Sequence, residues 1–241
     1  MLEQAWLIPV FPIVAFLLIM VCGRFEPLRS QFVASGSWLA LIGVGGSSAL
    51  SLLVAWEVFT SGHGPYEETW TWFEGATFAF EGGIYLDGLA ALLLVVVGIV
   101  SFLVVMFSMG YMADEGERRI RYYAEICLFV GVMQGLVIAN SFLLLFIFWE
   151  LVGLCSYLLI GFWYEKPSAA SAAKKAFLVT RVGDVFLLFG LVILFNTFGT
   201  LRYSELFADP ALLAEHATEL KWATLCLFGG AVGKSAQFPL H

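Results

Sequence analysis

Four ionisable side chains lie in stretches that are otherwise apolar: Glu150, Arg181, Asp184 and Lys234. Glu150 is near the middle of the run 141–163, about 14 Å from its start if the run is a helix. A carboxylate at that depth in a bilayer costs at least about 2.5 kcal/mol unless it is neutral, paired or hydrated. Intramembrane ionisable groups are functional by default, and the function indicated here is holding and releasing a proton. The alternative is a protonated carboxyl bonded structurally in the core.

Lys234 lies about fourteen residues into a segment that starts at Leu220, roughly 21 Å along a helix. A lysine at that depth needs a partner and water, or gives up its proton, so it can store a proton. The alternative is a lysine that snorkels to the inner membrane surface. The neighbouring Gly233 and Pro239 favour function, because membrane helices interrupted by Gly and Pro are typical of transporter sites.

Arg181 and Asp184 are three residues apart, so their side chains share one face of a helix. They fit an internal ion pair that lowers the cost of insertion as well as they fit a part in proton transfer. Lys175, beside Lys174, fits a loop charge on the inner side better than a functional group. His241, just after the interrupted segment, is a candidate to extend a proton path.

The composition indicates an integral membrane protein. Apolar residues make up 61% of the 241-residue chain, against about 45–50% in soluble domains, and charged residues 13%, about half the usual share. The net charge of −7 and the absence of a basic stripe argue against nucleic acid as a partner. The four cysteines have no spacing that suits a metal or an iron–sulfur cluster, and no nucleotide fingerprint is present. We therefore expect no cofactor and no metal in this chain.

The elements that must position these residues are apolar segments long enough to cross a bilayer. We predict an all-α polytopic fold of about seven transmembrane helices: 2–21, 32–56, 86–109, 123–139, 141–163, 176–198 and a seventh from residue 220. The stretch 164–175 is either a short connecting helix or an early start to the sixth span. Residues 57–81 are polar and acidic, and 69–73 and 77–80 alternate with period two, which predicts a β-hairpin within about 66–81.

The distribution of basic residues predicts the orientation. The loops after the first, third and fifth spans carry Arg24, Arg29, Arg118, Arg119, Arg121, Lys166, Lys174 and Lys175. The loops after the second and sixth spans carry only Arg202 and, at the edge, Lys221. The basic loops are therefore expected on the cytoplasmic side (or the matrix or stroma side) of a membrane, and the N-terminus and the hairpin on the outer side.

The seventh span is expected to break near 233–239, and the sequence is interpreted as the first part of a longer protein that ends within this broken helix. We divide it into 1–122, which holds three spans and the hairpin, and 123–241, which holds the four charged or interrupted spans.

Two motifs carry a resemblance to a known family: FWELVGLCSYLLIGFWYEKPSAASAAKKAFLVTRVGDVFLLFG and GGAVGKSAQFPLH. They are similar to the antiporter-like, proton-pumping subunit L (chain 5) of NADH:quinone oxidoreductase, respiratory complex I, and the similarity covers essentially the whole chain. The resemblance implies that residues 123–241 form most of the first antiporter-like repeat. It implies that Glu150 tunes the pKa of Lys234, which accepts and releases the pumped proton. Arg181 and Asp184 match charged positions of the sixth span, and Lys175 a basic position near it.

The resemblance also implies a non-redox subunit of an oxidoreductase, with other membrane subunits of complex I, the lipid bilayer and protons as partners. Flavin, iron–sulfur clusters and nucleotide would belong to other subunits, and this piece alone is expected to be inactive. A subunit of a multisubunit Na+/H+ antiporter, or of a related ion or inorganic-carbon transporter, shares the motifs and is the alternative. A structural scaffold whose charges merely pair is the third hypothesis.

Overall fold

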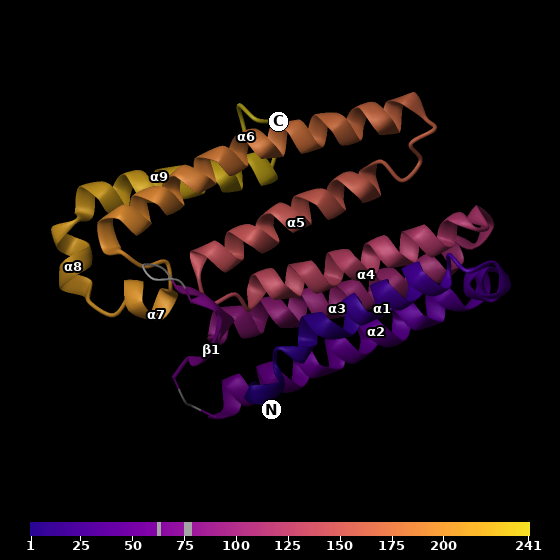
Figure 1. The fold of residues 1–241 in the computed structure, drawn as a ribbon, viewed down its shortest axis with the longest axis horizontal. Helices are drawn as coiled ribbons and strands as arrows, with labels where there is room; N and C mark the ends of the chain where they lie inside the picture. The colour runs from indigo at the N-terminus through magenta and orange to yellow at the C-terminus, as the bar shows by residue number, and fades with distance from the viewer. Residues whose placement is uncertain (62–63, 75–78) are drawn as a thin grey trace. The chain divides into compact units, whose positions relative to one another are not determined.

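The computed structural model describes residues 1–61, 64–74 and 79–241, with side chains for all of these except 26–35, 72–74 and 79–80. It forms two compact units, Met1–Ile138 and Ala139–His241. Each unit is built mainly of long helices (Figure 1). The sequence-based division into 1–122 and 123–241 marks the expected start of an antiporter-like repeat. It stays a prediction.

The first unit contains four long helices. Its elements are a 3-10 turn at Leu2–Gln4, α1 (Leu7–Cys22), α2 (Glu26–Ser61), strands β1 (Tyr66–Glu74) and β2 (Ala79–Leu86), α3 (Gly88–Tyr111), a second 3-10 turn at Ala113–Glu115, and α4 (Arg118–Val137). Helix α1 packs against α2 and α4, and α2 packs against α3.

Small residues on α2 bring the helices of the first unit close together, because they let neighbouring backbones approach. A Cβ at Gly43 would lie 2.6 Å from the Cβ of Ala15 on α1. On the opposite side, the Ser48 hydroxyl donates to the carbonyl of Gly98 on α3 at 2.8 Å. A buried hydroxyl has no bulk water to bond to, so this carbonyl serves as its partner across the helix interface.

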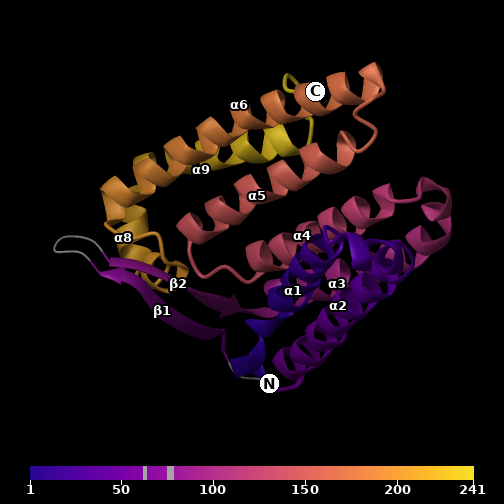
Figure 2. The same ribbon diagram turned by 45° about the vertical axis from the view of Figure 1, so that its right-hand side comes forward.

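The predicted hairpin is confirmed and is longer than the alternating residues alone indicate. Strands β1 and β2 pair antiparallel from Tyr66 opposite Leu86 to Glu74 opposite Ala79, and Figure 2 shows them side by side. The strand β2 ends at Leu86, the first residue of the predicted third span, and Ile84 and Leu86 are buried in the core of the first unit. Asp87 then caps α3 by accepting from the amide of Ala90 at 2.7 Å.

The second unit contains the three helices that carry the intramembrane charges. Its elements are α5 (Phe142–Ile160), α6 (Pro167–Phe198), α7 (Tyr203–Leu206), α8 (Pro210–Glu215) and α9 (Ala217–Lys234). Helix α6 starts at Pro167, in the first turn, where proline is tolerated, so the early start is the alternative that the structure adopts. Lys174 and Lys175 thus lie within α6 rather than in a loop.

Helix α6 packs against both α5 and α9, and Figure 1 shows α6 and α9 running side by side. The two helices touch through their backbones, because a Cβ at Gly183 would lie only 2.9 Å from the Cα of Gly233. This close approach is the local feature that brings the end of α9 to the charged face of α6.

Six helices of the described residues are long and apolar enough to cross a membrane. The seventh predicted span, α9, is not among them, since its 18 residues include Glu219, Lys221 and Lys234. Large apolar side chains face outward along the helices, as Phe189 does with 59% of its surface exposed. The chain is a multi-pass membrane protein, as its hydropathy predicts.

Candidate functional site

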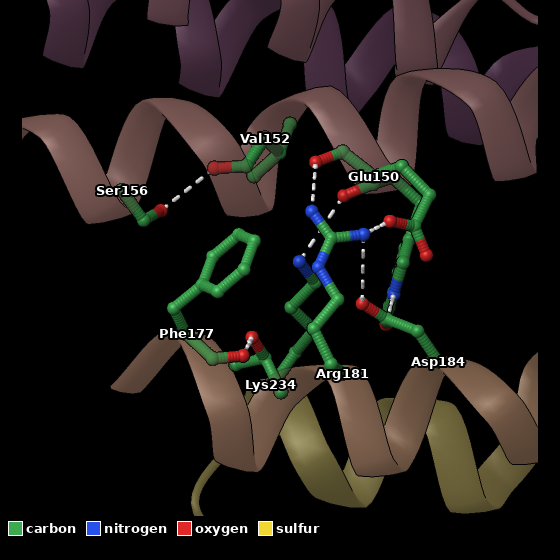
Figure 3. Close-up of polar contacts among 9 residues, drawn as sticks. Glu150, Val152, Ser156, Phe177, Arg181, Asp184 and Lys234 are labelled. Atoms are coloured by element: carbon green, nitrogen blue, oxygen red, sulfur yellow. Dashed lines mark hydrogen bonds and ion pairs between the residues drawn. The ribbon is translucent and has the colours of Figure 1, made fainter. Parts of the chain in front are cut away.

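Three helices of the second unit bring the four intramembrane charges together. Glu150 comes from α5, Arg181 and Asp184 from α6, and Lys234 from the last position of α9 (Figure 3). The cluster contains the four residues named from the sequence. Their contacts with one another differ in part from those expected.

Arg181 connects the two acidic residues. Its guanidinium forms an ion pair with the Glu150 carboxylate through Nη1, and the same nitrogen lies 3.8 Å from Oδ2 of Asp184. Its Nη2 also donates to the backbone carbonyl of Glu150 at 3.4 Å, and the group lies 4.5 Å from the ring centre of Phe177. The predicted pairing of Arg181 with Asp184 is present, and the contact with Glu150 is one that the sequence did not indicate.

Asp184 is the most deeply buried of the four, with 3% of its side chain exposed. Its Oδ1 accepts a hydrogen bond of 2.7 Å from the indole Nε1 of Trp149, the residue before Glu150 on α5. Trp149 is a site residue that was not predicted from the sequence. The signal was its position, because an indole N–H within an apolar helix needs an acceptor from a neighbouring one.

Lys234 contacts α5 rather than a carboxylate. Its Nζ donates to the backbone carbonyl of Trp149 at 3.1 Å and lies 5.6 Å from the centre of the Trp149 ring. Over the residues that the structure describes, no ion pair joins Lys234 to an acidic side chain. The cation is therefore held by a carbonyl dipole and an aromatic face, in the same cluster as the Glu150–Arg181–Asp184 ion pairs.

The predicted break in the seventh segment is confirmed. Helix α9 ends at Lys234, and Ala236, two residues on, has a φ of 49°, a left-handed conformation that no α-helix continues. Pro239 follows in the non-helical end of the chain. Backbone groups freed at such a break need water or polar side chains as partners.

A cavity of about 410 Å³ lies at this break, within the second unit. Lys175, Lys234 and His241 line it, together with the hydroxyl-bearing residues Ser156 and Thr180. Since water occupies about 30 Å³ per molecule in the liquid, the cavity has room for several waters. Lys175 and His241, the two peripheral candidates from the sequence, thus share a cavity with Lys234.

Two family models match the chain. Residues 139–241 match the family described as NADH:quinone oxidoreductase/Mrp antiporter, TM, and residues 72–123 match the one described as NADH-Ubiquinone oxidoreductase (complex I), chain 5 N-terminus. The first match covers the second unit and includes all the site residues named above.

Similar proteins are subunits of multisubunit membrane complexes. The NADH-quinone oxidoreductase subunit L of Escherichia coli is 43% identical over 96% of this chain, and the F(420)H(2) dehydrogenase subunit L of Methanosarcina mazei is 38% identical over 99%. The chain spans 37% of the length of each of these relatives. Among solved structures, the Mrp complex of Dietzia sp. matches 98% of this chain with a TM-score of 0.78 at 23% identity, covering 24% of that chain, which shows a shared fold.

Proposed function

Because the chain belongs to the antiporter-like subunit L (chain 5) family of NADH:quinone oxidoreductase, we propose that it is part of a proton-translocating membrane subunit of such a complex. Protons would pass through the charges of the second unit, driven by electron transfer in other subunits. Since the chain covers little more than a third of its relatives' length, this function is proposed for the full-length protein. The piece in hand is expected to be inactive alone.

The observation that carries the proposal is Lys234 at the C-terminal end of α9, beside a cavity and within a cluster of charged side chains. A lysine can lose and regain its proton, whereas the arginine of the cluster keeps its charge. In the proposed cycle Lys234 takes a proton from one side of the membrane and releases it toward the cavity. Glu150 and Asp184, both held by Arg181, set the electric field at Lys234.

We assign no cofactor and no metal to this chain, and propose that the redox groups belong to other subunits of the complex. The four cysteines are free, and within the described residues no three His, Cys, Asp or Glu side chains cluster as metal ligands do. The proposed partners are the neighbouring membrane subunits and the lipid bilayer. The proposed location is a bacterial inner membrane with the N-terminus on the outer side.

A subunit of a multisubunit Na+/H+ antiporter is the second candidate. The family model that matches 139–241 covers both kinds of protein by its description, and the fold is shared with an Mrp complex. In that case the same site would move protons without a redox partner.

The two candidates differ in what drives the proton. We expect the complex purified with the full-length protein, reconstituted in vesicles, to acidify or alkalinise the lumen only while an electron donor and a quinone are consumed. This should hold at every Na+ concentration. Proton movement that instead follows an imposed Na+ gradient, with no electron donor present, would favour the antiporter.

The orientation is tested by labelling single cysteines with a membrane-impermeant reagent, after replacing the four native cysteines by alanine. Gly64, just before β1, and Asp114, between α3 and α4, are both exposed. We expect Gly64→Cys to react from the outer face and Asp114→Cys from the inner face, because the loop that holds Asp114 leads to the basic residues Arg118 and Arg119. If both cysteines react from the same face, α3 does not cross the membrane between them and the predicted orientation is wrong.

A further inference from the structure

We infer that Trp149 and Gly153 form a seat on α5 for the charged amino group of Lys234, and that they are positioning residues for the proton carrier. The seat consists of the Trp149 carbonyl, the face of its indole ring and the space above Gly153. This inference rests on the proposed function, because holding the Lys234 amino group affects pumping only if Lys234 carries the proton.

Gly153 leaves the space that the ammonium occupies. A Cβ built on Gly153 would lie 2.6 Å from Nζ of Lys234, well inside the contact distance of real side chains. Any other residue at this position would therefore push the amino group away from α5. Gly153 lies one turn after Trp149, which places the gap directly beside the carbonyl that accepts from Lys234.

The Trp149 carbonyl can hold the lysine without leaving the helix. In an α-helix this oxygen accepts from the amide of Gly153, and its second lone pair is free for another donor. Nζ uses it at 3.1 Å, and the hydrogen bond is strengthened by the positive charge of the donor. The indole ring, 5.6 Å away, adds a cation–π contact on the same side.

Trp149 also ties the seat to the acidic part of the cluster, since its indole N–H donates to Asp184 at 2.7 Å. Among the described residues, the charged or titratable groups around Lys234 are Glu150 and Tyr157 from α5, Arg181, Asp184 and Lys175 from α6, and His241 from the end of the chain. The seat itself is uncharged, so Lys234 can release its proton there without abandoning a carboxylate partner. A movement of the Asp184 carboxylate would turn the Trp149 ring and so change its contact with the Lys234 amino group.

The test compares two glycine variants of the full-length protein in the assembled complex. We expect Gly153→Ala to lower the number of protons moved per electron pair through this module about tenfold, and to displace its pH profile by about one unit. Gly229→Ala is the control: its methyl would lie 2.9 Å from the Cβ of Phe186, also closer than side chains normally approach, but this contact is apolar. It should keep the wild-type pH profile, even if assembly is weakened.

A third variant separates the ring from its hydrogen bond. Trp149→Phe keeps an aromatic face and the backbone carbonyl but loses the donor to Asp184, so we expect a smaller loss of pumping than in Gly153→Ala, again with a displaced pH profile. Wild-type pumping and pH profile in both Gly153→Ala and Trp149→Phe would overturn the seat. If pumping is lost in Lys234→Met while these two variants behave as wild type, the seat alone is wrong. Normal pumping in Lys234→Met would instead contradict the proposed function.

Discussion

Replacement of Lys234 by methionine in the full-length protein is expected to abolish proton translocation through this module. Methionine preserves much of the length and apolar character of the side chain but carries no proton, so the carrier is lost while the α6–α9 packing is kept. That packing depends on Gly183 and Gly233 rather than on the lysine side chain. The measurement is proton uptake per electron pair in reconstituted vesicles, with assembly checked by the subunit content of the purified complex.

Lys234→Arg distinguishes a proton carrier from a fixed charge. A guanidinium stays protonated at any accessible pH, and its planar fork does not fit the single point of contact above Gly153. We therefore expect the arginine variant to fail as completely as the methionine variant. Wild-type pumping with arginine would mean that Lys234 acts only through its charge.

Hydropathy and period-two alternation were enough to predict the long helices and the hairpin, but not all of their ends. The strand β2 runs to Leu86, because this apolar residue is buried under the helices of the first unit rather than in lipid. Helix α6 begins at Pro167, nine residues before the apolar run at 176. Local sequence does not distinguish apolar residues that face protein from those that face lipid, and polar residues can extend a helix beyond the hydrocarbon.

The members of the site could be predicted because each charge is costly in an apolar segment. Their pairing could not. The ion pair of Arg181 with Glu150 depends on how α5 is rotated against α6, whereas the contact with Asp184 follows from a spacing of three on one helix. A sequence also does not show which backbone carbonyl accepts a side-chain hydrogen bond. The contact of Lys234 with the Trp149 carbonyl could therefore not be predicted.

Glu150→Gln is expected to leave the complex assembled and to impair proton pumping by about tenfold or more. The amide keeps the shape of the carboxyl but cannot form the ion pair with Arg181, whose remaining carboxylate contact is Asp184 at 3.8 Å. Loss of one partner from a buried pair costs about 3–5 kcal/mol, and from an exposed pair at most about 1 kcal/mol. The pair joins two apolar helices, α5 and α6, so the cost for a buried pair is the relevant upper limit.

The role of Arg181 in that effect is measured by a double-mutant cycle with Arg181→Gln. If Glu150 acts mainly by holding Arg181, the double variant should pump no worse than the poorer single variant, because the interaction is already lost in each. If Glu150 also acts directly on the charge of Lys234, the losses should multiply.

Glu150→Asp should be the mildest change, since it keeps the negative charge and only shortens the side chain. Normal pumping with glutamine at position 150 would rule out any role for its charge.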